Sequence, residues 1–222
     1  MERSLSKIRD VDLKILSELD DRDLLNFCKT GKYGNELCNN ENFWRVRVQT
    51  KFPAASKIKL PSRSWKNFYL KIVYYIDKYR NADDFMFEAV RRNEQDMIDF
   101  SILRGASDWI NGMKFAAKTG NVELVKFIIE KAELKGAGWY EYDWNMGLFW
   151  SAQGGHIYLM KFFIKNGANE VNRAMYAAAV GGHKNAIDYL ISQGANMWYE
   201  GLHGAKRAKN EELIAFFGNK LI

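Results

Sequence analysis

The segment that decides the fold is AAVGGHKNAIDYLISQGAN, residues 178–196. It places two small residues before a glycine turn, then an apolar stretch with helical spacing, then the stop Gly194-Ala195-Asn196. Glycine supplies the backbone freedom that a tight connection between two helices needs, and it readily ends a helix in the left-handed conformation. The segment therefore predicts a pair of short helices joined by a tight turn.

The same pattern recurs from residue 82 to the end of the chain. The apolar segments of the second helices begin at positions 97, 124, 159, 186 and 213, so the spacings are 27, 35, 27 and 27 residues. In each first helix a long apolar residue precedes a small one by three positions, which lets a neighbouring helix approach closely. These pairs are Met86/Ala89, Met113/Ala116, Leu148/Ser151, Met175/Ala178 and Leu202/Ala205. One helix pair cannot bury its own apolar faces, but a stack of five can.

The turn glycines Gly120, Gly155 and Gly182 complete a pattern, Ala-Ala-x-x-Gly-(Asn/His) through to Gly-Ala-Asn, that resembles the ankyrin repeat over residues 82–222. The resemblance implies a solenoid of about five repeats, at 82–108, 109–143, 144–170, 171–197 and 198–222. Ankyrin units usually have 33 residues and open with Thr-Pro-Leu-His, which is absent here. The missing residues should come from the β-hairpin between units, so we expect short loops there. This shortened form is similar to repeats that are abundant in giant DNA viruses.

The amino-terminal segment predicts a small cluster of short helices. Leucines recur at helical spacing from Leu13 to Leu19, Asp20 or Asp21 can cap a second helix, and Phe43 and Trp44 would close a little core. The order of these residues resembles the F-box, with the module at residues 1–50. The resemblance implies binding to the Skp-type adaptor of cullin–RING ubiquitin ligases through Leu13, Leu16, Leu19, Leu24 and Leu25. The alternative is that these leucines are simply internal core.

Residues 51–81 are interpreted as a basic linker and an amphipathic helix. The apolar residues from Trp65 to Ile76 follow a spacing of three to four, and their face should pack on the first repeat. Residues 45–80 carry a charge of +9, whereas the flanking segments carry −2 and −1. We interpret this basic stripe as a solvated face; a phosphate-binding or acidic-partner role is the less favoured alternative. The ten basic residues are Arg45, Arg47, Lys51, Lys57, Lys59, Arg63, Lys66, Lys71, Lys78 and Arg80.

The composition predicts an all-α protein, because only 2 prolines occur and no stretch alternates cleanly at period two. The first residues lack the apolar run of a signal peptide, and 18 consecutive apolar residues occur nowhere. We therefore expect a soluble protein of a reducing compartment with no membrane contact, cytoplasmic or nuclear, in a host cell if the chain is viral. Cys28 and Cys38 are interpreted as small core residues, not as a zinc or disulfide framework.

The repeats offer two candidate contact surfaces. One is the column of the first helices that changes freely from unit to unit, together with residues before the turn glycine. This candidate groove contains Glu88, Arg91, Arg92, Phe115, Lys118, Trp150 and Gln153, an aromatic centre edged with charge. The other is the insertion in the second unit, with Trp139, Tyr140 and Tyr142, which either extends a binding loop or folds back onto the core. The column Trp109, Trp144 and Trp198 is interpreted as core.

No pattern predicts catalysis, a cofactor or a metal. His156 and His183 sit at repeat turns, where a structural role is expected, and no phosphate loop or metalloprotease pattern occurs. The preferred hypothesis is a substrate receptor that links a target protein to a cullin–RING ubiquitin ligase by proximity. The alternative is a stand-alone ankyrin protein that binds or masks a partner. A nucleic-acid role through the basic stripe is disfavoured because no reader motif accompanies the charge.

Overall fold

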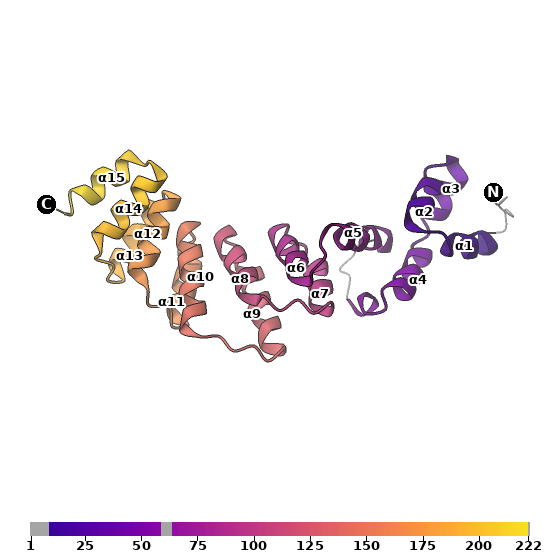
Figure 1. Ribbon diagram of the computed structural model, residues 1–222, viewed down its shortest axis with the longest axis horizontal. Coiled ribbons are helices and arrows are strands. Elements are labelled where there is room, and N and C mark those ends of the chain that lie inside the picture. Colours follow the sequence, from indigo (N-terminus) through magenta and orange to yellow (C-terminus); the bar gives the residue numbers. More distant parts are fainter. Residues whose placement is uncertain (1–8, 59–63, 222) are drawn as a thin grey trace. The chain divides into compact units, whose positions relative to one another are not determined.

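The computed structural model describes residues 9–58 and 64–221, without the side chains of Arg9, Asp10 and Tyr142. Every regular element in these ranges is a helix (Figure 1), which confirms the all-α prediction. None of the described helices is long and apolar enough to cross a membrane. The chain divides into an amino-terminal unit, Met1–Phe85 with Gln95–Ala106, and a repeat unit, Met86–Glu94 with Ser107–Ile222. Each unit is described by itself.

The amino-terminal unit is a cluster of short helices around an aromatic core. Asp20 caps its second helix by accepting from the backbone N–H of Asp23 at 2.8 Å. Phe43 and Trp44 are buried as predicted, and the Trp44 indole donates to the carbonyl of Cys38 at 2.7 Å. The helices are α1 (Arg9–Ser17), α2 (Asp21–Cys28), α3 (Gly31–Cys38), α4 (Glu41–Lys51), the 3-10 helix η1 (Ala55–Lys57), α5 (Trp65–Lys78) and α7 (Gln95–Leu103).

Arg47 of α4 is buried and fastens the end of α1. Its guanidinium donates to the carbonyl oxygens of Leu16 at 3.3 Å and Ser17 at 3.1 Å, and to that of Leu19 at 2.6 Å. The last carbonyls of a helix lack partners within the helix, and a cation there also complements the helix dipole. The expectation that the whole basic stripe forms a solvated face is therefore wrong at Arg47, whose side chain is 2% exposed. Lys59 and Arg63 of that stripe lie outside the described residues.

Asp21 gathers three donors around one carboxylate. It accepts from Arg47 at 2.8 Å, from Lys51 at 2.8 Å and from the hydroxyl of Tyr69. Burial raises the pKa of Asp21, but the hydrogen bonds from Arg47, Lys51 and Tyr69 outweigh it and lower the pKa overall. Burial, followed by the hydrogen bond to Asp21, raises the pKa of Tyr69. The network ties α2, α4 and α5 together.

Cys28 and Cys38 form a disulfide, which corrects the expectation of two unpaired thiols. The two residues end α2 and α3, and the turn between these helices brings their sulfur atoms together. A spacing of ten residues does not reveal this, because it depends on the path of the intervening helix.

Helix α5 presents the apolar face that its spacing predicts. Phe68, Ile72 and Tyr75 are buried on it. The ring of Tyr75 stacks on Phe85 at 4.5 Å between centroids, and Phe85 contacts Phe100 of α7 at 5.7 Å. Within the amino-terminal unit, α5 therefore packs against residues from the first repeat, as expected.

The repeat unit is a succession of helix pairs. Helices α8, α10, α12 and α14 pack on one another in order, and each also packs on the second helix of its own pair. The small column Ala116, Ser151, Ala178 and Ala205 is fully buried between them, as predicted. The helices are α8 (Trp109–Thr119), α9 (Val122–Leu134), α10 (Glu141–Gln153), α11 (Ile157–Lys165), α12 (Val171–Gly181), α13 (Lys184–Ser192), α14 (Trp198–Ala208) and α15 (Glu211–Gly218), and α6 (Ala82–Arg91) is divided between the two units.

The turn glycines and histidines have the structural role that the repeat pattern indicates. Gly120 has a φ of 76°, and a Cβ there would collide with the imidazole of His156. His156 also places Nε2 3.0 Å from the carbonyl oxygen of Lys118. His183 packs on Gly155 in the same way one repeat later. Each histidine thus ties the turn of its own repeat to the turn before it.

Asparagine side chains hold the loops where longer ankyrin units have hairpins. No strand occurs among the described residues, which confirms the expected short loops. The side-chain oxygen of Asn145 accepts from the backbone N–H groups of Asn169 at 2.8 Å and Glu170 at 3.0 Å. One repeat later, Asn172 accepts from Asn196 at 2.8 Å and from Met197 at 2.9 Å. These bonds pair backbone donors that a hairpin would otherwise satisfy.

Candidate functional site

The charged end of the candidate groove is an ion-pair cluster on α6. Glu88 accepts from Arg91 and Arg92, both at 2.6 Å, and its side chain is 10% exposed. The hydrogen bond from Arg91 lowers the pKa of Glu88 to about 2 against the opposing effect of burial, with Arg92 helping. Glu88 is therefore committed to these two arginines, and the two guanidinium groups form the exposed part of the cluster.

The aromatic centre of the groove joins α8 to α10. Phe115 and Trp150 are half-buried. The Lys118 ammonium lies 5.2 Å from the centre of the Trp150 ring, a distance that permits a cation–π contact. The indole N–H of Trp150 and the side-chain oxygen of Gln153 are buried and have no hydrogen-bond partners within the described part of the chain. These four predicted residues lie on one face of two adjacent helices; whether they bind a partner stays a prediction.

The groove column does not continue as a surface into the last two repeats. Ala177 and Gly204 occupy the equivalent positions, and both are buried. A Cβ on Gly204 would collide with the carbonyl oxygen of Tyr176 and come within 2.9 Å of the Cβ of Ala179. Because α12 and α14 approach this closely, the column must hold small residues there. In this column only Phe115 and Trp150 offer half-buried aromatic surface among the described residues, and whether they contact a partner stays a prediction.

A second aromatic column of the last three repeats lies one position earlier; it is half-buried at Phe149 and Tyr176 and exposed at His203. Phe149, Tyr176 and His203 are spaced by 27 residues and form a ladder, with ring centres 6.5 Å apart for the first pair and 5.4 Å for the second. This column was not predicted as a site from the sequence, although four of its five members are aromatic or histidine. Its five members are Phe87, Lys114, Phe149, Tyr176 and His203.

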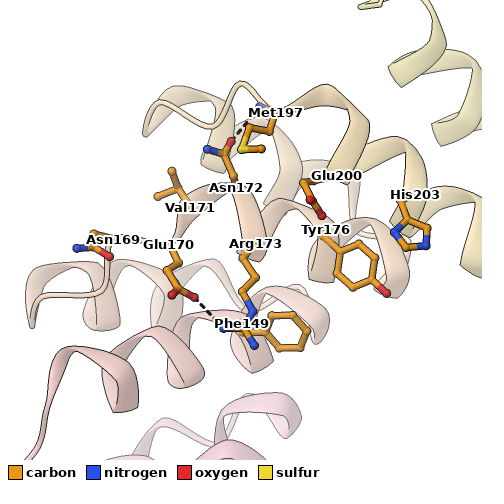
Figure 2. A pocket seen from close by; sticks show the side chains of 10 residues that line it. All are labelled: Phe149, Asn169, Glu170, Val171, Asn172, Arg173, Tyr176, Met197, Glu200 and His203. Atoms are coloured by element: carbon orange, nitrogen blue, oxygen red, sulfur yellow. Dashed lines mark hydrogen bonds and ion pairs between the residues drawn. The ribbon is translucent and has the colours of Figure 1, made fainter.

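The aromatic ladder lines a pocket of about 680 Å³ (Figure 2). Its walls come from α10, from the start of α12 and from the start of α14, with the loops that precede the last two helices. A volume in this range accommodates a ligand group of several non-hydrogen atoms. The lining residues are Phe149, Asn169, Glu170, Val171, Asn172, Arg173, Tyr176, Met197, Glu200 and His203.

The insertion in the second repeat mostly lengthens helices. Helix α9 has 13 residues where α11 and α13 have 9 each. The ring of Trp139 lies 5.5 Å from that of Trp144, so this residue packs back onto the repeat. Its indole N–H is buried and finds no hydrogen-bond partner among residues 9–58 and 64–221. Tyr140 is 73% exposed. The side chain of Tyr142 lies outside the described residues.

The predicted adaptor-binding leucines separate into two groups. Leu16 and Leu24 are buried in the core of the amino-terminal unit. Leu13, Leu19 and Leu25 are only half-buried. The core interpretation therefore applies to the first two residues, and the other three retain surface for a contact.

Leu13 lies in a groove between α1 and α4. The groove has a volume of about 340 Å³, and Phe43 and Val46 line it as well. Val46 is 46% exposed although it is apolar. Lys14 and Lys51 stand among the lining residues and give the groove a basic edge. An apolar floor with a charged edge is the composition of a protein contact surface.

The sequence matches a family model over part of the repeat unit. Residues 113–200 match the model described as Ankyrin repeats (3 copies). The match runs from α8 into α14 and includes all residues that line the pocket of the aromatic ladder except His203, but it covers less than half of the chain. No curated protein matches the sequence at a significant level. The chain therefore contains ankyrin repeats, and these indicate a role in protein–protein interaction.

Proposed function

We propose that the protein is a substrate receptor. In this proposal the amino-terminal unit binds a Skp-type adaptor of a cullin–RING ubiquitin ligase, and the repeat unit holds a target protein. The mechanism is proximity, because the chain brings the target near the ligase and performs no chemistry of its own. Ankyrin repeats indicate the protein contact; the recruitment of an adaptor is the finer proposal.

The half-buried leucines of α1, of α2 and of the turn between them are the observation that carries this proposal. Leu13, Leu19 and Leu25 keep part of their apolar surface although Leu16 and Leu24 already fill the core. Burying such a side chain fully contributes about 1.5–3 kcal/mol relative to full exposure, so completing the burial of three supplies part of that for each. A partner that covers α1 and α2 would therefore gain stabilisation without disturbing the core.

The groove between α1 and α4 supplies a specific docking position. Leu13 and Val46 offer apolar surface there, and Arg47 behind them fixes the end of α1. A preorganised surface loses less conformational entropy on binding. The basic edge at Lys14 favours an acidic adaptor surface and speeds its association.

The experiment uses the full chain and a purified Skp-type adaptor in isothermal titration calorimetry. Leu13→Asp and Leu19→Asp should each weaken binding at least about tenfold, because a carboxylate would be buried in an apolar contact. Leu134→Asp is the matched control, since Leu134 is 73% exposed on α9 and far along the chain from this surface. Circular dichroism checks that each variant retains its helices.

The outcomes separate the two hypotheses. Binding that is lost in the two amino-terminal variants and kept in Leu134→Asp supports the receptor. An adaptor that does not bind the unaltered chain contradicts it. The protein would then be a stand-alone ankyrin binding or masking protein, with the helices α1–α4 as a structural cap.

A further inference from the structure

The pocket lined by Phe149, Tyr176 and His203, called the ladder pocket below, contains two equivalent positions that are 27 residues apart in the sequence. At the first place, Arg173 lies with its guanidinium 5.5 Å from the centre of the Phe149 ring and donates to Glu170 at 3.0 Å. Both of its partners therefore belong to the chain itself. A ring and a carboxylate together hold one arginine side chain there.

The second place has the ring and a carboxylate but no arginine between them. Moving forward by 27 residues replaces Phe149 by Tyr176, and Arg173 by Glu200. Glu170 is replaced by Met197, which is 53% exposed. Glu200 therefore occupies, relative to Tyr176, the repeat position that Arg173 occupies relative to Phe149, and its charge is opposite (Figure 2).

The carboxylate of Glu200 has no hydrogen-bond or ion-pair partner among the residues that the structure describes, and Glu200 as a residue is half-buried in the wall of the pocket. Arg207 donates to the hydroxyl of Tyr176 at 2.9 Å, but it does not line the pocket. An unpaired carboxylate on the wall of a pocket can accept a charge-assisted hydrogen bond, so a cation supplied from outside would pair with it.

We propose that the ladder pocket binds an arginine side chain of the target protein. The guanidinium would pair with Glu200 and lie against Tyr176, repeating the arrangement that Arg173 has with Glu170 and Phe149. The exposed thioether of Met197 would cover the methylene stem. This inference rests on the proposed function only in that the repeats hold a protein target; it does not depend on the adaptor.

The charges of the pocket favour a cation over an anion. Its lining has two carboxylates, Glu170 and Glu200, against one guanidinium, that of Arg173, which is already paired. The whole chain carries +6, so general electrostatics would repel a basic ligand. Binding of a basic ligand must therefore come from a local site. Arginine suits it better than lysine, because a planar guanidinium pairs with a carboxylate in two bonds and stacks on a ring.

The test titrates the full chain with fluorescein-labelled nona-arginine and follows fluorescence anisotropy, with nona-lysine as the comparison. The arginine peptide should bind more tightly than the lysine peptide. Glu200→Gln should weaken its binding roughly tenfold, since a charge-assisted pair is lost. Glu212→Gln, an exposed acid of α15, is the matched control and should leave the affinity within about twofold.

Two further variants act in opposite directions. Glu200→Arg would place the chain's own guanidinium by Tyr176 and should abolish the difference between the arginine and lysine peptides. Arg173→Gln would release Glu170 and the Phe149 ring, and should strengthen binding of the arginine peptide. Circular dichroism checks that the Arg173→Gln variant retains its helices, so that a gain of affinity can be assigned to the pocket.

Three results would overturn the inference: no binding of nona-arginine, equal affinity for the lysine peptide, or equal loss in Glu200→Gln and Glu212→Gln. Adaptor titrations with the same variants keep the two proposals distinct. Glu200→Gln should leave adaptor binding unchanged, and Leu13→Asp should leave binding of the arginine peptide unchanged.

Discussion

The two units are stabilised in different ways. In the amino-terminal unit one buried guanidinium, that of Arg47, reaches three backbone carbonyls, a carboxylate and a hydroxyl from three other helices. In the repeat unit the same small contacts recur, such as His156 on Gly120 and His183 on Gly155. A unique polar network concentrates stability in one side chain, whereas a repeat array distributes it among neighbours. Substitutions in the two units should therefore differ in how much they lower the free energy of unfolding and in how many helices they affect.

The largest effect is expected from Arg47→Met. The change takes the donors away from three backbone carbonyls and removes one of the three donors to Asp21, which leaves only Lys51 and Tyr69 there. Breaking a buried ion pair in this way costs about 3–5 kcal/mol in the free energy of unfolding. Hydrogen exchange followed by mass spectrometry should show lost protection in α1, α2, α4 and α5. Arg45→Met is the control, because Arg45 is exposed and bonds only to Asn42 of its own helix. Comparable loss in both variants would mean that Arg47 is not the centre of the unit.

The next effect is expected from the disulfide between Cys28 and Cys38. Replacing both cysteines by alanine should lower the free energy of unfolding by about 2–3 kcal/mol, because the link restricts the unfolded chain over a short loop. The measurement is urea denaturation of the unaltered chain, with and without reductant, beside the double variant. Reductant should lower the urea concentration at the unfolding midpoint of the unaltered chain and leave that of the double variant unchanged. Identical curves for the unaltered chain in both conditions would contradict the stabilising role.

A smaller and more local effect is expected in the repeats from Gly147→Ala. A Cβ at this position would collide with the ring of Phe163 in α11, so one helix pair must shift at a cost of about 1–3 kcal/mol. Hydrogen exchange should rise in α10 and α11 more than in α14 and α15. Gly218→Ala is the matched control, since a Cβ there meets nothing within 4 Å. Equal loss of protection throughout the repeat unit would show that the array responds as one block.

The smallest effect is expected at Glu88 and depends on pH. Its pKa is lowered to about 2 from an ordinary 4.5, so the carboxylate stabilises the fold above a pH of about 4.5 and loses that contribution as the pH falls toward 2. Its arginine partners are exposed, so Glu88→Gln should cost about 1 kcal/mol at pH 7. The two proteins should become equally stable near pH 2. A difference that persists undiminished at pH 2 would contradict the ion-pair origin.

The repeats could be predicted from the sequence because one spacing recurs. Columns such as Met113 with Ala116 reveal the buried face without knowledge of the partner helix, and the turn glycines mark where each pair bends. The short loops between helix pairs could be predicted because the repeating unit is shorter than the 33 residues of a usual ankyrin unit. What the recurrence did not reveal is which of two adjacent columns faces outward: Ala177 is buried, and Tyr176 beside it lines the pocket.

The amino-terminal unit could be predicted less completely, because its contacts are unique. The leucine spacing indicated the helices and part of the core. The burial of Arg47 depends on Asp21 and Tyr69, 26 and 22 positions away, and no local pattern connects these residues. The pairing of Cys28 with Cys38 likewise depends on how α2 and α3 turn. The pocket could not be predicted from the sequence for the same reason. Glu200 is a candidate ligand-binding residue only because the fold places it beside Tyr176 in the pocket lining.

In the proposed function the amino-terminal unit binds a Skp-type adaptor and the repeat unit binds the target protein. Hydrogen exchange of the full chain, measured with and without saturating Skp-type adaptor, tests it most directly. We predict slower exchange in α1, α2 and α4 around Leu13, with exchange in α10, α12 and α14 unchanged. Protection that falls on the helices of the ladder pocket, or no protection at all, would contradict the claim.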